Sequence, residues 1–164
     1  VNNCTIVEIP KQLHSNNTPY KSSIIRKELK TNPNFAFELL GHEYPIYGTI
    51  IKGNNRGQKI GFPTANLQQL PTKCIPKNGV YSSTIIIDNI SYPSITNIGN
   101  NPTYGTQTTS IETHILNNFD QDIYNKKALL LIKHFIRDEM KFNSEKELIT
   151  QIEQDLTHPS IRSN

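Results

Sequence analysis

Runs of β-branched and aromatic residues recur along the chain from position 44 onward, and each run has the length of a strand. They cover 46–51, 80–87, 90–98, 111–116 and 129–136, and this composition is typical of β-strands. Clusters of Gly, Pro and Asn lie between them. Short strands separated by turn signals predict an antiparallel barrel or sandwich rather than a βαβ fold.

Two short helices are predicted before the strands. The first covers 24–29, after a pair of serines that can cap it. The second begins at Asn32, a natural N-cap, with Pro33 in the first helical position, and Gly41 ends it. Because two small helices cannot bury a core alone, we expect this segment to dock on the rest of the chain. Its apolar face consists of Phe35, Leu39 and Leu40.

A third helix is predicted after the last strand. Ser144 followed by Glu147 forms a capping box. An apolar stripe at helical spacing follows, which indicates a helix that packs across an open side of the barrel. We therefore expect a mainly β fold, a six-stranded or similar barrel with a C-terminal α-helix. The residues of the stripe are Leu148, Ile149, Ile152 and Leu156.

The composition excludes several classes of protein. The 164 residues fit one ordinary domain, and no run of 18 apolar residues is present. Polar residues interrupt the first apolar positions, so we expect no signal peptide in this stretch. Cys4 and Cys74 are too few for a disulfide framework, so we expect a reduced, cytoplasmic protein. The net charge is +3, with Arg26-Lys27 and Lys126-Lys127 as the basic pairs. This charge is too small and scattered for a nucleic-acid-binding surface, and we expect neither nucleic acid nor membrane as a partner.

A glycine-rich stretch at 53–66 carries the first candidate chemistry. Three glycines with a lysine and an arginine could wrap phosphates with backbone N–H groups, although the Walker A spacing fails. A hairpin loop is the alternative. Thr64 and Asn66 are two residues apart, so in an extended backbone both side chains face one way. Their oxygens suit Mg²⁺, and capping of a local turn is the alternative role.

A strand with mixed faces carries the second candidate. Alternation over 110–115 places Glu112 and His114 on one face, opposite isoleucine and threonine. Glu112 is either a solvated side chain or a general base that takes a proton from a substrate hydroxyl. His114 has the same two interpretations, and we do not choose between them.

Two further segments have more than one interpretation. The stretch 97–105 is expected to be a tight connection in which two glycines adopt special conformations, a structural role. Arg137, where the last strand ends, could stack on or bond a planar ligand. An ion pair with Glu139 or Asp138 is the simpler explanation.

Taken in order, these segments resemble the riboflavin kinases over about 44–157. The resemblance implies a six-stranded β-barrel that transfers the γ-phosphate of ATP to the ribityl 5′-hydroxyl of riboflavin and so forms FMN, with Mg²⁺ as cofactor. Asn125 departs from the family, which usually has Gly after the Tyr, but Asn tolerates a left-handed backbone. The matching residues are Gly53, Arg56-Gly57, Gly61 to Leu67, Gly79-Val80-Tyr81, Asn97-Ile98-Gly99, Pro102-Thr103, Glu112-Thr113-His114, Tyr124, Phe135-Ile136-Arg137 and Phe142.

The resemblance also implies roles for individual residues. Glu112 matches the catalytic base, and Thr64 and Asn66 match the ligands of the Mg–nucleotide. Gly53, Lys59 and Thr64 match positions that contact the nucleotide in the family, and Tyr124 matches a position near the adenine. The loop that closes over the flavin matches Arg137 and Met140. A non-catalytic barrel that binds flavin or nucleotide is the alternative to a kinase.

The head of the chain resembles the junction found in bacterial bifunctional enzymes, where an FMN adenylyltransferase module precedes the kinase. Lys21 and Ser23 stand where Ser and Thr are usual, and the His motif of that module is absent from these residues. We therefore expect a C-terminal piece with kinase but not adenylyltransferase capacity. The expected organisation is a remnant or linker at 1–43, a riboflavin kinase domain at 44–158 and a tail at 159–164.

Overall fold

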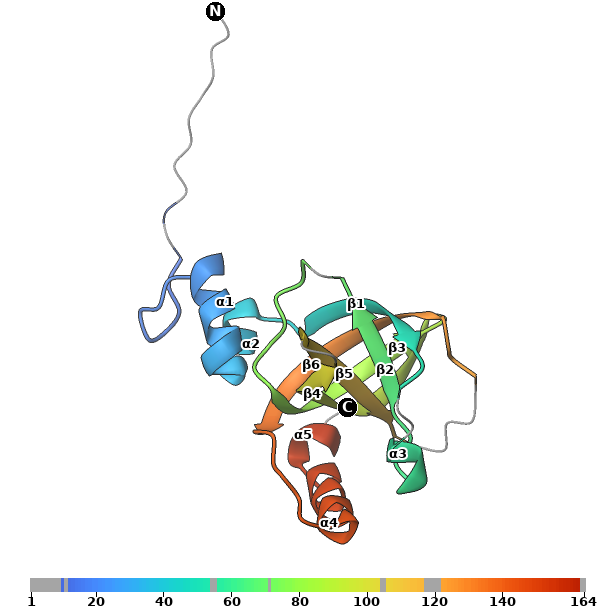
Figure 1. Cartoon of the computed structure of the whole chain (residues 1–164). Helices are drawn as coiled ribbons and strands as arrows, with labels where there is room; N and C mark the ends of the chain where they lie inside the picture. The colour runs from blue at the N-terminus through green and yellow to red at the C-terminus, as the bar shows by residue number, and fades with distance from the viewer. Residues whose placement is uncertain are drawn as a thin grey trace, which may run out of the picture.

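Six antiparallel strands form a closed barrel in the computed structural model, which describes residues 10, 12–53, 56–70, 72–103, 106–116 and 122–162 (Figure 1). The order around the barrel is β1-β2-β5-β4-β3-β6, and β6 pairs with β1 to close it. The predicted mainly β, six-stranded barrel is confirmed. The strands are β1 (Tyr44–Ile51), β2 (Ala65–Gln69), β3 (Gly79–Ile87), β4 (Ile90–Thr103), β5 (Thr106–Ile115) and β6 (Lys127–Arg137).

The interior of the barrel is filled by one side chain in two from each strand, as the period of a β-strand requires. On β5, Ile111, Thr113 and Ile115 are buried, whereas Glu112 and His114 on the other face are partly exposed. The predicted alternation is therefore confirmed. The largest fully buried aliphatic side chains of the strands are Ile46, Ile50, Ile85, Ile98, Ile111, Leu130 and Ile132.

One whole strand and one strand end differ from the sequence prediction. The pattern does not predict β2, because Pro63 precedes it and polar residues occupy most of its length. Strand β4 continues to Thr103, so the expected tight connection from position 97 onward is wrong. Gly99 does not have a positive φ. A Cβ there would lie 2.4 Å from Glu139 Oε1, so the Glu139 carboxylate approaches this glycine closely.

The predicted N-terminal helices form as α1 (Ser22–Thr31) and α2 (Pro33–Leu40). Asn32 caps α2 by accepting a hydrogen bond from the backbone N–H of Phe35, and Gly41 ends it with φ +70°. Both signals agree with the prediction. The serine cap of α1 is wrong, because the helix begins at Ser22 and Lys21 occupies the N-cap without a side-chain bond.

These two helices pack directly on the barrel. Leu29, Ala36 and Phe37 belong to the same buried cluster as the strand interior. The backbone N–H of Lys77 donates to Leu29 O at 2.7 Å. Asn34 bonds both backbone groups of Phe135 on β6, at 2.7 Å through its Oδ1 and 3.2 Å through its Nδ2. The N-terminal helices therefore close one side of the barrel.

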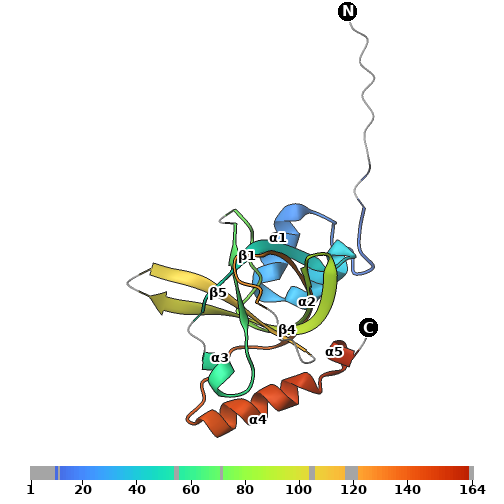
Figure 2. The same ribbon diagram turned by 90° about the vertical axis from the view of Figure 1, so that its right-hand side faces the viewer.

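Three helices follow within and after the strands: α3 (Arg56–Lys59), α4 (Glu145–Leu156) and α5 (Pro159–Arg162). Ser144 caps α4 as predicted, because its Oγ accepts from the backbone N–H of Glu147 at 3.2 Å. Figure 2 shows α4 running alongside the barrel, away from α1 and α2. Within the described residues, every helix is too short or too polar to cross a membrane.

Candidate functional site

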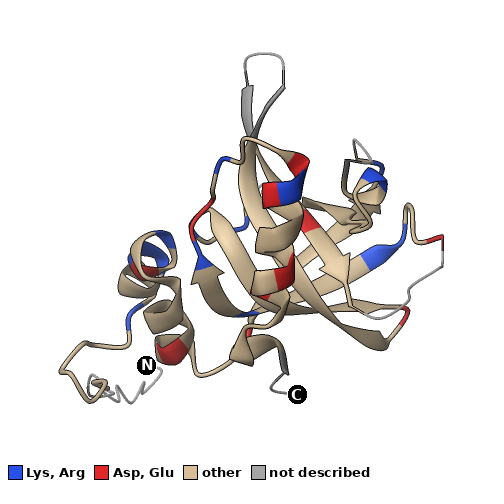
Figure 3. Cartoon of the chain, turned by 90° about the horizontal axis from the view of Figure 1, so that it is seen from below, with Lys and Arg blue, Asp and Glu red and all other residues tan. Residues whose placement is uncertain are grey.

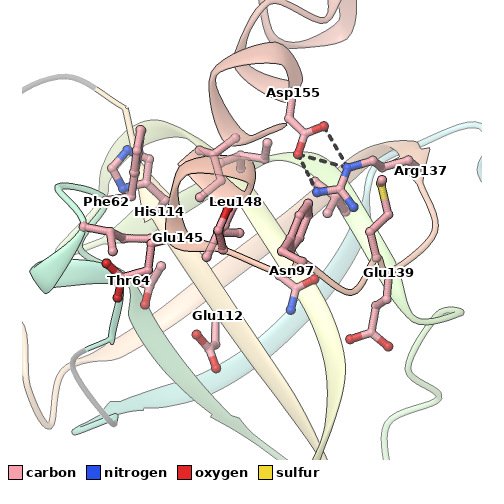
Figure 4. A pocket seen from close by; sticks show the side chains of 18 of the residues that line it. Phe62, Thr64, Asn97, Glu112, His114, Arg137, Glu139, Glu145, Leu148 and Asp155 are labelled. Atoms are coloured by element: carbon pink, nitrogen blue, oxygen red, sulfur yellow. Dashed lines mark hydrogen bonds and ion pairs between the residues drawn. The ribbon is translucent and has the colours of Figure 1, made fainter. Parts of the chain in front are cut away.

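A cavity of about 610 Å³ lies between the outer face of the barrel and α4. Its walls come from four parts of the chain: the segment that contains α3, strands β3 to β6, the loop 138–143, and α4 itself (Figure 4). The side chains that line it include Phe62, Thr64, Asn97, Glu112, Arg137 and Ile152.

Glu112 lies in the middle of this wall. In the barrel register it pairs with Asn66 on β2 and with Asn97 on β4. Its neighbour Thr113 is buried inside the barrel, so the Glu112 side chain is on the outer face, toward the cavity. Figure 4 shows Thr64 on one side of Glu112 and Asn97 on the other. A carboxylate is therefore flanked by neutral polar side chains that can orient a hydroxyl or a cation.

The segment before β2 is held against the barrel by His114. The Nδ1 of His114 donates to the backbone carbonyl of Pro63 at 2.8 Å, since a carbonyl can only accept. The ring of Phe62 lies edge-on to His114, with centroids 5.5 Å apart. His114 also lines the cavity. Because Thr64 is the next residue after Pro63, His114 holds the backbone that carries Thr64.

Residues expected on the nucleotide side fall into two groups. A Cβ on Gly53 would lie 2.1 Å from Nδ2 of Asn66, so glycine lets the chain just after β1 lie against that amide. Gly53 and Asn66 therefore lie together, beside Glu112 in the register. Lys59 is exposed on α3, and Tyr124 is exposed with Lys52 Nζ 5.6 Å from its ring centroid. Neither Lys59 nor Tyr124 lines the cavity.

Asn125, next to Tyr124, has φ +63°. Its backbone N–H donates to Ile50 O at 2.8 Å. This is the left-handed conformation that the sequence predicts Asn to accept in place of glycine. The turn that carries Tyr124 is therefore anchored to the end of β1.

Arg137 and Met140, the residues expected on the flavin side, both line the cavity. Met140 is exposed on the loop 138–143. Arg137 makes an ion pair with Asp155 of α4, with Nη2 2.8 Å from Oδ2. The expected ion pair of Arg137 with Glu139 or Asp138 is wrong. The backbone carbonyl of Asp138 accepts a hydrogen bond from Arg137, and the carboxylate of Asp138 forms an ion pair with Lys77.

Carboxylates outnumber cations along the cavity wall. Arg137 is the fixed cation among the lining residues. Figure 3 shows charges of both signs spread over the described chain. A wall of this character attracts a cation more readily than a free anion. The lining carboxylates are Glu112, Glu139, Glu145 and Asp155.

Several lining residues were not predicted from the sequence as parts of a site, among them Asn97, Glu139 and Asp155. Asn97 was assigned a structural role, although its strand position, next to inward-facing Ile98, places it on the outer face. Glu139 enters the site from the loop after β6, where it accepts from Asn78 Nδ2 at 3.0 Å. Asp155 is a carboxylate on the apolar side of a helix, one turn from Ile152, and that position was a readable signal.

Comparison with known proteins identifies the family. Residues 40–160 match the family model described as riboflavin kinase. The bifunctional riboflavin kinase/FMN adenylyltransferase of Listeria monocytogenes is 40% identical over 121 residues, which cover 73% of this chain and 38% of that protein. The enzyme of the same description from Bacillus subtilis is 36% identical over 156 residues, which cover 93% and 48%. The chain thus spans half or less of the length of these relatives.

Solved structures share the fold. A crystal structure from Streptococcus pneumoniae, described as a macrolide-efflux protein, has a TM-score of 0.82 and 33% identity, covering 90% of this chain and 48% of the other. Riboflavin kinase from Trypanosoma brucei has a TM-score of 0.50 and 21% identity, covering 74% and 84%, which shows the fold alone. The family model covers the barrel and α4, and the bacterial relatives are 36 to 40% identical. This chain therefore belongs to the riboflavin kinase family and is homologous to the C-terminal part of the bacterial bifunctional enzymes.

Proposed function

We propose that this chain is a riboflavin kinase that transfers the γ-phosphate of ATP to the ribityl 5′-hydroxyl of riboflavin, giving FMN and ADP. The observation that carries the proposal is the place of Glu112. It faces a cavity between barrel and helix, and its cross-strand neighbour Asn66 lies against Gly53. Glu112 thus stands between the two groups of residues that would hold the two substrates.

In the proposed reaction, the Glu112 carboxylate accepts the proton of the 5′-hydroxyl while that oxygen attacks the γ-phosphorus. The new O–P bond forms as the bond between the γ-phosphorus and the β,γ-bridging oxygen breaks, and ADP leaves. Phosphoryl transfer depends mainly on positioning and charge neutralisation. Asn97, beside Glu112 on the flavin side, is placed to orient the hydroxyl by a hydrogen bond.

The residues around Thr64 fit a magnesium ion that accompanies the nucleotide. A hydroxyl from Thr64 and an amide oxygen from Asn66 are hard, neutral ligands, and Mg²⁺ combines such ligands with phosphate oxygens and water. Bound there, the ion would supply charge neutralisation on the phosphates. His114 holds the segment before Thr64, and Gly53 lets the backbone that follows β1 approach Asn66.

On the nucleotide side we assign Gly53 and Lys59, which belong to the glycine-rich segment, and Tyr124, whose ring lies beside Lys52 just before it; all three lie outside the cavity lining. On the flavin side we assign Met140 and Arg137, which lie at the other end of the cavity. The apolar side chains of α4 that line the cavity, Leu148 and Ile152, would contact the isoalloxazine ring.

The first test is an assay of the purified chain with riboflavin, ATP and MgCl₂, in which riboflavin, FMN and FAD are separated by HPLC. We expect FMN, and none after addition of EDTA. Riboflavin that binds without conversion to FMN would instead support a non-catalytic flavin-binding barrel. FAD in the product would show adenylyltransferase capacity.

The second test is the substitution Glu112→Gln, which preserves shape but removes the base. We expect kcat to fall by about 10² to 10⁴, with riboflavin binding retained. Glu153→Gln is the matched control, because Glu153 is an exposed carboxylate on α4 outside the cavity. A rate close to wild type in Glu112→Gln contradicts the assignment of the base.

The third test is Asn66→Ala. Loss of the amide oxygen should raise the concentration of Mg²⁺ needed for half-maximal rate, while the riboflavin affinity measured by fluorescence quenching stays the same. An unchanged Mg²⁺ requirement would remove Asn66 from the metal site.

A further inference from the structure

Asp155 stands out on α4. All residues of this helix are described, and Asp155 is the buried one among them, with 4% of its side chain exposed. Helix residues that line the cavity, such as Leu148 and Ile152, remain partly exposed. Burial of a carboxylate is unfavourable unless charge and hydrogen bonds compensate for the lost water. The position therefore requires a specific partner.

That partner is the guanidinium of Arg137. Its Nε lies 2.8 and 3.1 Å from the two carboxylate oxygens, and its Nη2 lies 2.8 Å from Oδ2. Gln151 donates to Oδ1 from one turn earlier, at 3.0 Å. Two parallel N–H groups on one carboxylate form the strong, directional fork that lysine cannot reproduce.

The remaining donors of Arg137 point toward its own loop. Nη1 donates to the backbone carbonyl of Asp138 at 2.9 Å, and the guanidinium carbon lies 6.0 Å from the centroid of the Phe142 ring. One arginine thus contacts the beginning of the loop 138–143, an aromatic residue near its end, and the helix beyond it. Asp155 and Arg137 join the two sides of this loop (Figure 4).

Strand β6 directs Arg137 to this place through an irregularity in its pairing with β3. Val80 pairs with Arg137 and Tyr81 with Phe135, so Ile136 is an extra residue on β6. Such a bulge changes the direction of the side chains that follow it. The loop after the bulge brings Glu139 and Met140 into the cavity wall.

From this geometry we propose that Asp155 is a positioning residue for the flavin substrate. It holds Arg137, and through it the loop 138–143 and α4, in the arrangement that forms the flavin end of the cavity. The proposal rests on the proposed function, because it states that the binding of riboflavin, and not that of ATP, depends on the contact between Asp155 and Arg137. In this role the guanidinium organises the loop around the flavin, and Asp155 acts through it without touching the reacting atoms.

The experiment compares Asp155→Asn, Arg137→Lys and the double variant with Glu153→Gln, an exposed carboxylate on the same helix. KM for riboflavin, KM for ATP and kcat are measured, together with Kd for riboflavin by fluorescence quenching and Tm. We expect both single variants to raise KM and Kd for riboflavin about tenfold, and KM for ATP to stay within about twofold. The double variant should be no worse than either single one, because both break the same contact.

Asp155→Glu keeps the charge and should recover part of the riboflavin affinity. If Asp155→Asn does not fold, Arg137→Lys carries the test, because it keeps the positive charge and loses only the fork. Equal increases in KM for both substrates, or additive effects in the double variant, would overturn the proposal. So would an unchanged riboflavin Kd in variants that fold.

The result for the wild-type chain separates this proposal from the proposed function. Wild-type chain that binds riboflavin but forms no FMN defeats the kinase assignment, and the riboflavin Kd of the variants then decides the role of Asp155 by the same criteria. Wild-type chain that binds no riboflavin defeats both.

Discussion

The helices that precede and follow the barrel strands in the chain are attached to the barrel in different ways. In α1 and α2, apolar side chains enter the core: Leu29 is 1% exposed, Ala36 0% and Phe37 8%. In α4, the buried residue is a charged one, Asp155, and the apolar residues that face the barrel stay partly exposed. A cavity of about 610 Å³ separates this helix from the strands.

The difference separates stability from ligand binding. Burial of apolar surface stabilises in proportion to area, so α1 and α2 contribute to the free energy of folding wherever they touch the barrel. A helix that leaves space between itself and the barrel buries less apolar surface and therefore contributes less to the free energy of folding. Its position then depends more on directional contacts, such as the ion pair between Arg137 and Asp155, and the space stays available for a substrate. The comparison predicts that mutations in the two regions affect different measured quantities.

The largest effect on stability is expected for Phe37→Ala. The Phe37 ring lies 6.4 Å from both Tyr44 and Tyr81, within the shared core. Removal of a buried aromatic side chain should lower the free energy of unfolding by about 3 to 5 kcal/mol, measured by urea denaturation. The riboflavin KM of the folded fraction should not change. Phe35→Ala, on the same helix but partly exposed, is the control with a smaller loss. Equal losses would contradict the idea that α2 seals the barrel.

A smaller loss of stability is expected for Asn34→Ala. This side chain satisfies the backbone N–H and C=O of Phe135 on β6. Without it, two partly buried backbone groups lose their partner, and the free energy of unfolding should fall by about 1 to 3 kcal/mol. The same denaturation experiment measures this loss. A rise in riboflavin KM without a loss of stability would show that α2 serves the flavin site rather than the core.

On the C-terminal side, Ile152→Ala should affect binding more than stability. Ile152 lines the cavity and is partly exposed, so the loss of stability should be about 1 kcal/mol, while the riboflavin Kd rises because an apolar contact with the flavin is lost. Ile149→Ala removes the same atoms from a position on α4 outside the lining. If both variants bind riboflavin equally well, the cavity is not the flavin site.

The smallest effect concerns pH. Burial, and then the neighbouring His158, lower the pKa of His134 below the usual 6.5. The unfolded chain therefore takes up a proton at higher pH than the folded one, so stability falls as the pH drops below about 6.5 and this loss is complete below the folded pKa. Denaturation at about pH 7.5 and 5.5 should show a weaker pH dependence in His134→Gln than in the wild type. His42→Gln, at an exposed position, is the control.

The sequence was most informative where a structure depends on near neighbours. Asn32, Pro33 and Gly41 determine the ends of α2, and Ser144 determines the start of α4, because caps bond backbone groups within one helical turn. Alternation along β5 placed Glu112 on the outer face for the same reason. Strand β2 was not predicted, because its polar composition does not indicate a strand. It forms a strand because it pairs with β1 and β5.

The sequence by itself thus determined the secondary structure of most segments, the barrel class and, through its motifs, the resemblance to the riboflavin kinases. Tertiary structure alone decided that Asn66, Glu112 and Asn97 stand side by side on three strands, and that Arg137 meets Asp155 rather than Glu139. These contacts join residues many positions apart, and closure of the barrel and packing of α4 select them. A local sequence pattern does not indicate which distant residue will be the partner. The free energy of such a contact depends on both residues together, and it is gained only when folding brings them into contact.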